Sequence, residues 1–96
     1  MSEEAPTTPP EPISVPAVLA MMIEQLAMLA WAKLGLQPDP MTGKLEQDLN
    51  DAKLAIDVLA DVVHRVEPEV DAEDKRQLEN LLRDLRINYV NRAGAA

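Results

Sequence analysis

The strongest constraint on this chain is a nearly unbroken apolar stretch at residues 15–36, VPAVLAMMIEQLAMLAWAKLGL. Only Glu24, Gln25 and Lys33 interrupt it with polar or charged side chains. A surface helix of a small monomer needs one apolar stripe facing its core, with polar residues on the opposite side. This stretch is apolar over most of its circumference, so something other than the core of a small monomer is expected to cover part of it.

Local signals define a helix within this stretch. Ser14 is a typical N-cap, and Pro16 is tolerated in the first turn, where its missing N–H would be unpaired in any case. Gly35 is a typical C-terminal stop, with prolines just beyond it. We predict a helix over residues 15–34.

Two further helices are expected, at about residues 44–66 and 72–91. Apolar residues in the first of these alternate at four- and three-residue steps, at Leu45, Leu49, Ala52, Ile56, Leu59, Val63 and Val66. The second begins after the candidate N-cap Asp71 and carries an apolar stripe at Leu78, Leu81, Leu82, Leu85 and Tyr89. Residues 14–92 therefore predict an all-α, three-helix unit with antiparallel neighbours.

Both ends of the chain differ in composition from this domain. Residues 1–13 are acidic and proline-rich, unlike an export signal, and we expect a disordered tail. Residues 93–96 are expected to fray. The chain has no cysteine, which excludes disulfides and thiolate chemistry and suits a cytoplasmic protein.

A helical wheel divides the first helix into two apolar faces. One face is assigned to the core, packed against both other helices, and contains Leu19, Met22, Ile23, Leu26, Ala30 and Leu34. The other is assigned to a partner and contains Ala17, Ala20, Met21, Glu24, Ala27, Met28 and Trp31. The alanines would let another helix approach closely, and Trp31 would serve as an anchor.

Solvent, a bilayer or another protein could cover the partner face. Alanine and methionine tolerate exposure, so solvent remains an alternative. A membrane span fits the length of the helix, but a charge near mid-span costs about 3 kcal/mol, and Glu24 lies there. Burying roughly 1,000 Å² between two copies would gain about 25 kcal/mol before an association cost of about 4–15 kcal/mol. We therefore expect no membrane span, and a homodimeric helical bundle or an unidentified protein partner.

Two segments of the chain resemble a known family. They are DLNDAKLAIDVLADV, residues 48–62, and LENLLRDLRINYV, residues 78–90, which follow an apolar first helix closed by Leu-Gly. The chain is similar there to the bacterial domain-of-unknown-function family numbered 1844. The most specific matches are Ala52, Lys53, Ile56, Asp57, Leu59, Leu82, Leu85, Arg86 and Tyr89.

The resemblance extends over about residues 18–90, with two departures. VEPEVD, residues 66–71, stands where the family usually has a Lys-Gly-Asn type of turn. Val18 and Leu19 stand where members tend to have Phe. The resemblance implies a small helical fold, and it supplies no catalytic residues, because the family has no assigned activity.

The sequence offers one weak candidate for a metal site. Asp57, Asp61 and His64 share one helix face, yet a structural zinc site needs four ligands, and a di-iron bundle needs a second set on facing helices. Phosphate-binding loops and nucleophile–base pairs are also missing from the sequence. We predict no enzyme activity, no metal site and no cofactor.

An alternative function is binding to RNA or to the ribosome. The C-terminal part of the third helix carries Arg83, Arg86, Tyr89 and Arg92, which could contact phosphates and stack on bases. A net charge of −8 opposes this interpretation, because cationic side chains supply most nucleic-acid affinity. Nucleic-acid binding is therefore the second choice, after protein binding.

Overall fold

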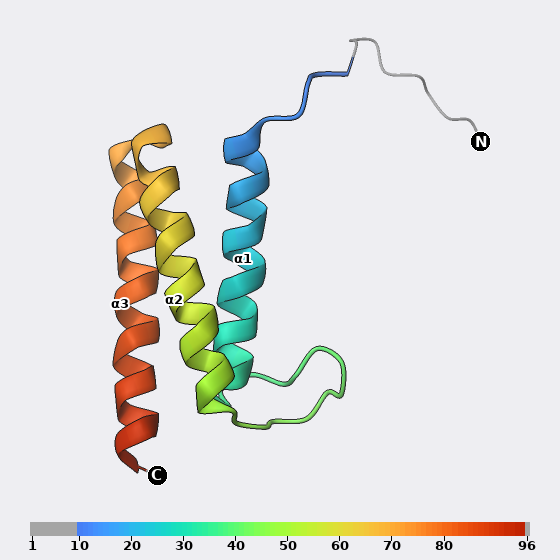
Figure 1. Ribbon diagram of the computed structural model, residues 1–96, viewed down its shortest axis with the longest axis vertical. Helices are drawn as coiled ribbons and strands as arrows, with labels where there is room; N and C mark the ends of the chain where they lie inside the picture. The colour runs from blue at the N-terminus through green and yellow to red at the C-terminus, as the bar shows by residue number, and fades with distance from the viewer. Residues whose placement is uncertain (1–9, 96) are drawn as a thin grey trace, which may run out of the picture.

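The computed structural model describes residues 10–95, which fold into three α-helices and one short 3-10 turn (Figure 1). The helices are α1 (Val15–Lys33), α2 (Leu49–Val66) and α3 (Ala72–Ala95), and the turn η1 (Glu67–Glu69) follows α2 directly. Over the same residues there is no β-strand, and one isolated bridge pairs Leu34 with Gln47. The predicted all-α fold is confirmed.

The predicted N-terminal tail lies largely outside the described residues. Positions 1–9 belong to that undescribed part, as does position 96 at the other end. Residues 10–13 adopt neither helix nor strand and are exposed.

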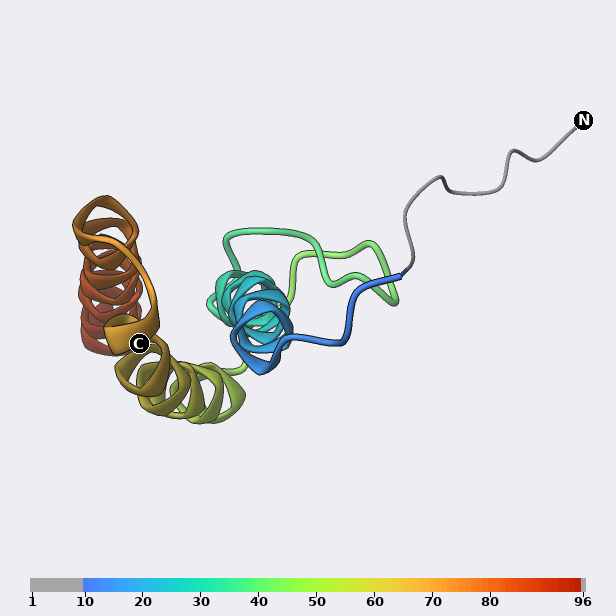
Figure 2. The same cartoon turned by 90° about the horizontal axis from the view of Figure 1, so that it is seen from above.

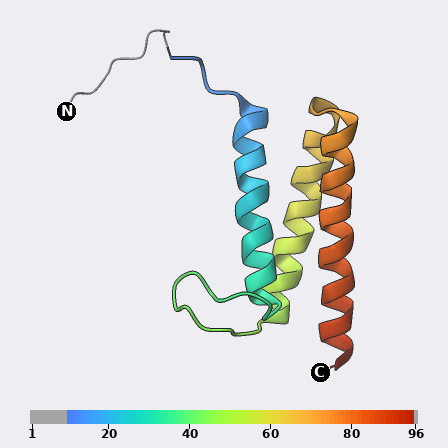
Figure 3. The same ribbon diagram turned by 180° about the vertical axis from the view of Figure 1, so that it is seen from behind.

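α2 lies between the other two helices and runs antiparallel to both (Figures 1 and 3). Seen from above, the helices form an open arc with α2 at its middle (Figure 2). α1 and α3 both pack along α2, but they hardly touch one another. The predicted antiparallel neighbours are thus confirmed. The expected packing of the first helix against both other helices is not confirmed, because α1 makes nearly all of its contacts between helices with α2.

An N-cap side chain precedes each helix. Ser14, Asp48 and Asp71 each accept a hydrogen bond from the backbone N–H three residues further on, at 3.3, 3.1 and 2.9 Å respectively. These bonds satisfy N–H groups that have no partner inside the helix. The caps predicted at Ser14 and Asp71 are confirmed.

The prediction that the second helix begins near residue 44 was wrong, because α2 begins at Leu49. The residues just before it are held by α1 instead: the Asp48 N–H donates to the Lys33 carbonyl at 2.8 Å, next to the bridge between Leu34 and Gln47. Residues 34–48, called the connector below, project from α1 on the side away from α2 (Figures 1 and 2).

The connector is also tied down by Lys33 and Asp39. The Lys33 ammonium lies 3.7 Å from the Asp39 carboxylate and 3.8 Å from that of Asp51 in α2. Asp39 Oδ1 accepts the N–H groups of Met41 and Thr42 at 2.8 and 3.2 Å, which lowers the pKa of its carboxyl group. Gly43 completes this turn with φ = 72°, a conformation that glycine adopts without strain.

The third helix is longer than predicted, since α3 continues to Ala95 and does not end near residue 91. The expected fraying of residues 93–96 stays a prediction. Alanine is the strongest helix former, so Ala93 and Ala95 favour the helix on both sides of Gly94, which itself costs about 1 kcal/mol there relative to alanine.

The core is centred on α2. Its predicted seam is confirmed at five buried residues, Ala52, Ile56, Leu59, Val63 and Val66. Leu82 and Leu85 from α3 are buried against it, and Leu78, Leu81 and Tyr89 are partly buried there. Leu45 was predicted to join the seam but is 65% exposed, because it lies in the connector before the helix begins.

Candidate protein-binding surface

α1 buries mostly small apolar side chains and leaves several large ones exposed. Its buried residues are one isoleucine and three alanines, Ile23, Ala27, Ala30 and Ala32. All three of its methionines are exposed, at 62% for Met21, 43% for Met22 and 46% for Met28. Val18 and Leu29 are also exposed, at 40% and 37%. An exposed set of large apolar residues on one helix is typical of a binding surface.

The predicted partner face is only partly exposed. Met21, Met28 and Ala17 are exposed, as expected. Ala27, in contrast, is buried in the core, and Trp31 is half-buried against it. The assignment of Ala27 was wrong because α2 covers a sector of α1 that includes Ile23 and Ala27, rotated toward the face that was assigned to a partner. The assignment of the half-buried Trp31 stays a prediction.

The predicted core face of α1 changes accordingly. Ile23, Ala30 and Leu34 are buried as expected, and Leu19 and Leu26 pack on the core while partly exposed. Met22 was assigned to the core, but it lies outside with Met21 and Met28. We call the exposed residues Val18, Met21, Met22, Gln25, Met28 and Leu29 the outer face of α1.

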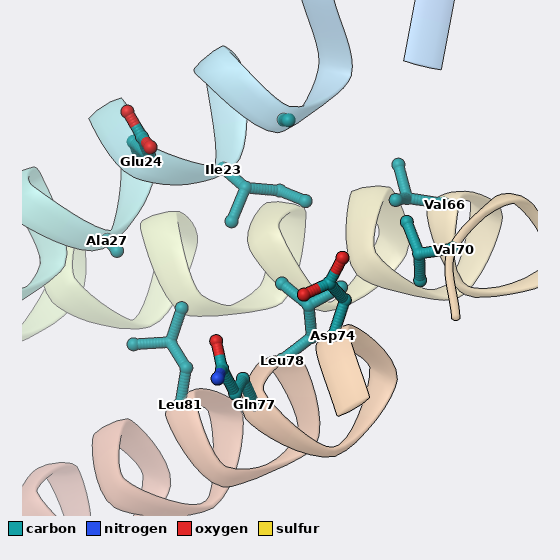
Figure 4. A pocket seen from close by; sticks show the side chains of 10 residues that line it. Ile23, Glu24, Ala27, Val66, Val70, Asp74, Gln77, Leu78 and Leu81 are labelled. Atoms are coloured by element: carbon teal, nitrogen blue, oxygen red, sulfur yellow. The ribbon is translucent and has the colours of Figure 1, made fainter. Parts of the chain in front are cut away.

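A groove of about 470 Å³ lies between α1 and α3, where these helices fail to meet. Figure 4 shows the side chains that line it, which come from α1, from the end of α2, from Val70 in the link before α3 and from the first part of α3. Most are apolar, with Ala20, Ile23, Ala27, Val66, Val70, Leu78 and Leu81 lining it beside Glu24, Asp74 and Gln77. The predicted partner residues Ala20, Glu24 and Ala27 therefore line this groove and do not belong to the outer face.

The predicted nucleic-acid residues do not form one patch. Arg83 and Arg92 are nine residues apart, which places them on opposite sides of α3 at 100° per residue. Tyr89 is half-buried against the core, so only part of its ring is available for stacking. Arg83 also lies 3.9 Å from the carboxylate of Asp84.

Arg86 and Tyr89 do share a small pocket of about 130 Å³ between α3 and α2. On the α2 side, the Lys53 ammonium donates a hydrogen bond of 2.9 Å to Asp57, which raises the pKa of Lys53. Because Asp57 already neutralises Lys53, Arg86 is the cation of this pocket that has no ion pair within the described residues. One such cation makes a weak site for a polyanion.

The described residues contain no cluster of three or more His, Cys, Asp or Glu side chains that could hold a metal ion. Asp61 and His64 are exposed, and Asp57 is paired with Lys53. In the same residues no polar or charged side chain is buried, so none has the desolvated environment that activates catalytic groups.

By length and composition alone, α1 qualifies as a helix that could cross a membrane. Its mean hydropathy is 1.6, and 22% of the residues in its most apolar window are buried by the rest of the described chain. The same features characterise a helix that binds protein. The polar residues along α1 therefore decide whether a membrane or a protein partner is the better covering for it.

Comparison with protein families gives one match. The family model described as "Domain of unknown function (DUF1844)" covers residues 16–91, which include all three helices except their outermost residues. No curated protein and no solved structure shows a significant match to the chain.

Proposed function

The chain belongs to the DUF1844 family, and we propose that it is a non-catalytic helical protein that binds protein through α1, either a second copy of itself or another chain. The observation that carries this proposal is the exposure of three methionines on the most apolar helix. Methionine surfaces adapt to apolar partners, because the side chain is flexible and polarizable.

The size of the surface is sufficient for association. A helix of 19 residues is about 28 Å long and about 10 Å wide, so covering half of it in each of two copies removes on the order of 1,000 Å² from water. Specific interfaces begin near this value. At about 25 cal/mol per Å² the gross gain is about 25 kcal/mol, which exceeds an association cost of roughly 4–15 kcal/mol.

Protein is a better covering for α1 than lipid because of two residues at its middle. Glu24 and Gln25 would both lie near the centre of a bilayer, where a carboxylate alone costs about 3 kcal/mol. At the edge of a protein interface, Glu24 can stay hydrated. Gln25 can form hydrogen bonds with a partner.

The test compares two glutamate variants with matched exposure. Met21 in α1 is 62% exposed and Leu54 in α2 is 63% exposed, so Met21→Glu and Leu54→Glu introduce the same charge at equally accessible sites. Sedimentation across a wide concentration range is expected to show a wild-type dimer, weakened about 100-fold by Met21→Glu and unchanged by Leu54→Glu.

Two results would contradict the proposal. Equal sedimentation of the two variants at every concentration would show that α1 is not the surface for self-association. If the wild type is a monomer, self-association is excluded and only binding to a different protein is left. That version is contradicted if the Met21→Glu and Leu54→Glu proteins retain the same set of bound proteins in the native cell.

A further inference from the structure

The outer face of α1 follows the spacing of a coiled-coil seam. Its residues fall at positions 18, 21, 22, 25, 28 and 29. Steps of three and four alternate from 18 through 21 and 25 to 28, and equally from 18 through 22 and 25 to 29, along about three turns. That spacing keeps a stripe facing one straight neighbouring helix over its length. The occupant that fits the outer face best is therefore another helix of similar length.

Gln25 is the only polar residue in this stripe and lies at its centre. The four residues that neighbour it on the helix surface, three and four positions away, are Met21, Met22, Met28 and Leu29, all large, apolar and exposed. Position 25 also lies next to the midpoint of α1, which extends from Val15 to Lys33. A single polar side chain within an apolar seam fixes the register and orientation of a helix pair.

We propose that the outer face binds α1 of a second copy in antiparallel orientation, with the two-fold axis passing beside Gln25. This inference rests on the proposed function and specifies its partner. Around such an axis Gln25 meets its own copy, Met21 meets Leu29 and Met22 meets Met28. A carboxamide both donates and accepts, so two Gln25 side chains are complementary to each other, whereas two carboxylates are not.

The position of the connector favours the antiparallel orientation over the parallel one. The connector projects from the C-terminal end of α1 on the side away from α2 (Figures 1 and 2). In a parallel pair both connectors would compete for the same space. In an antiparallel pair they lie at opposite ends, and the macrodipoles of the two helices also oppose one another favourably.

The natural absence of cysteine allows a direct test by disulfide formation. Gln25→Cys is expected to cross-link with itself under mild oxidation. Met21→Cys and Leu29→Cys are each expected to cross-link poorly alone and efficiently when mixed. Two copies of position 21 would be offset by about 12 Å along the antiparallel axis, beyond the limit of about 7 Å for Cα atoms joined by a disulfide.

Leu54→Cys provides the background rate, because its side chain has similar exposure on a different helix. We expect Gln25→Cys, and the mixture of Met21→Cys with Leu29→Cys, to cross-link at least tenfold faster than this control. Far-UV circular dichroism verifies that each variant keeps its helices.

The possible outcomes separate this inference from the proposed function. Fast cross-linking of Met21→Cys with itself would establish a parallel pair and overturn the inference, while leaving α1 as the binding surface. Rates equal to Leu54→Cys at all three positions would overturn the inference as well. The proposed function would then survive only if Met21→Glu still weakened association with a different partner.

A pair of single substitutions tests the role of Gln25 itself. Gln25→Glu places two carboxylates at the axis and is expected to weaken the dimer at least tenfold at neutral pH, with recovery in acid as the carboxyls become protonated. Glu24→Gln makes the reverse change one position away, outside the stripe, and is expected to leave the affinity within about threefold. Equal effects of the two changes would contradict the assignment of the axis to Gln25.

Discussion

Leu59→Ala is expected to be among the most destabilising substitutions in this protein. Leu59 lies in α2, the helix on which both others pack, and its side chain is 0% exposed. The substitution removes three carbon groups worth about 0.8 kcal/mol each, and the cavity that remains adds about 1 kcal/mol. The expected loss is therefore about 3 kcal/mol, a large share of the roughly 5–15 kcal/mol that stabilises a domain.

Leu54→Ala provides the matched control, because it makes the same change in the same helix at a side chain that is 63% exposed. Its effect is expected to stay within about 0.5 kcal/mol. Urea denaturation at one fixed protein concentration gives both values, with a lower midpoint and an unchanged m-value for Leu59→Ala. A loss below about 1 kcal/mol, or equal losses in the two variants, would refute the placement of α2 at the centre of the core.

Four further predictions concern the cap of α3, two glycines and the carboxyl group of Asp39 in the connector. Asp71→Ala removes the side chain that accepts an N–H at the start of α3, so it should cost about 1 kcal/mol in urea denaturation while Asp71→Asn costs much less. Gly43→Ala should lower the free energy of unfolding by about 1–2 kcal/mol, because φ is 72° there and a residue with a Cβ is strained in that conformation. A steric clash would not be the cause, since a Cβ at this position meets no atom within 4 Å. Gly94→Ala, inside α3, should be neutral or stabilising, and thermal denaturation of the two glycine variants measures both effects. Asp39 should titrate below its ordinary pKa of 3.8 by NMR, so its contribution to stability is complete above that pH and lost as the pH falls through the lower value of the folded state. A midpoint at or above 3.8 would show that its two backbone hydrogen bonds are absent in solution.

The parts of the fold that could be predicted from sequence are those determined by neighbouring residues. The caps at Ser14 and Asp71 depend on a side chain and an N–H three residues apart, so the local sequence contains the whole interaction. Gly35 ends α1 in the same way: it has φ = 82°, and its N–H donates to the carbonyl of Ala32. The buried seam of α2 follows from a period that only a helix satisfies.

The parts that could not be predicted depend on contacts between distant residues. Residues 44–48 are held outside the helix by Lys33 and by the bridge from Leu34 to Gln47. A local signal for the start at Leu49 was also present and was missed, since Asp48 is an N-cap residue whose side chain accepts the Asp51 N–H. The orientation of α1 depends on how many helices cover it. A wheel gives the apolar faces of a helix without their neighbours, so it could not reveal that α2 provides nearly all of the packing of α1. Met22 was therefore assigned to the core and Ala27 to the partner face, whereas the structure exposes Met22 and buries Ala27.

This difference between the predicted and the observed faces of α1 bears on the proposal that the helix binds a partner. The side chains that α1 buries against its own chain are mostly alanines, which contribute little hydrophobic free energy, since the area buried by a methyl group is small. Their role is to let α1 approach α2 closely. Three large apolar side chains, Met21, Met22 and Met28, stay partly exposed to water, at 62%, 43% and 46%. Covering the outer face would therefore add to the stabilisation of α1, and binding there and the stability of this helix are expected to rise together.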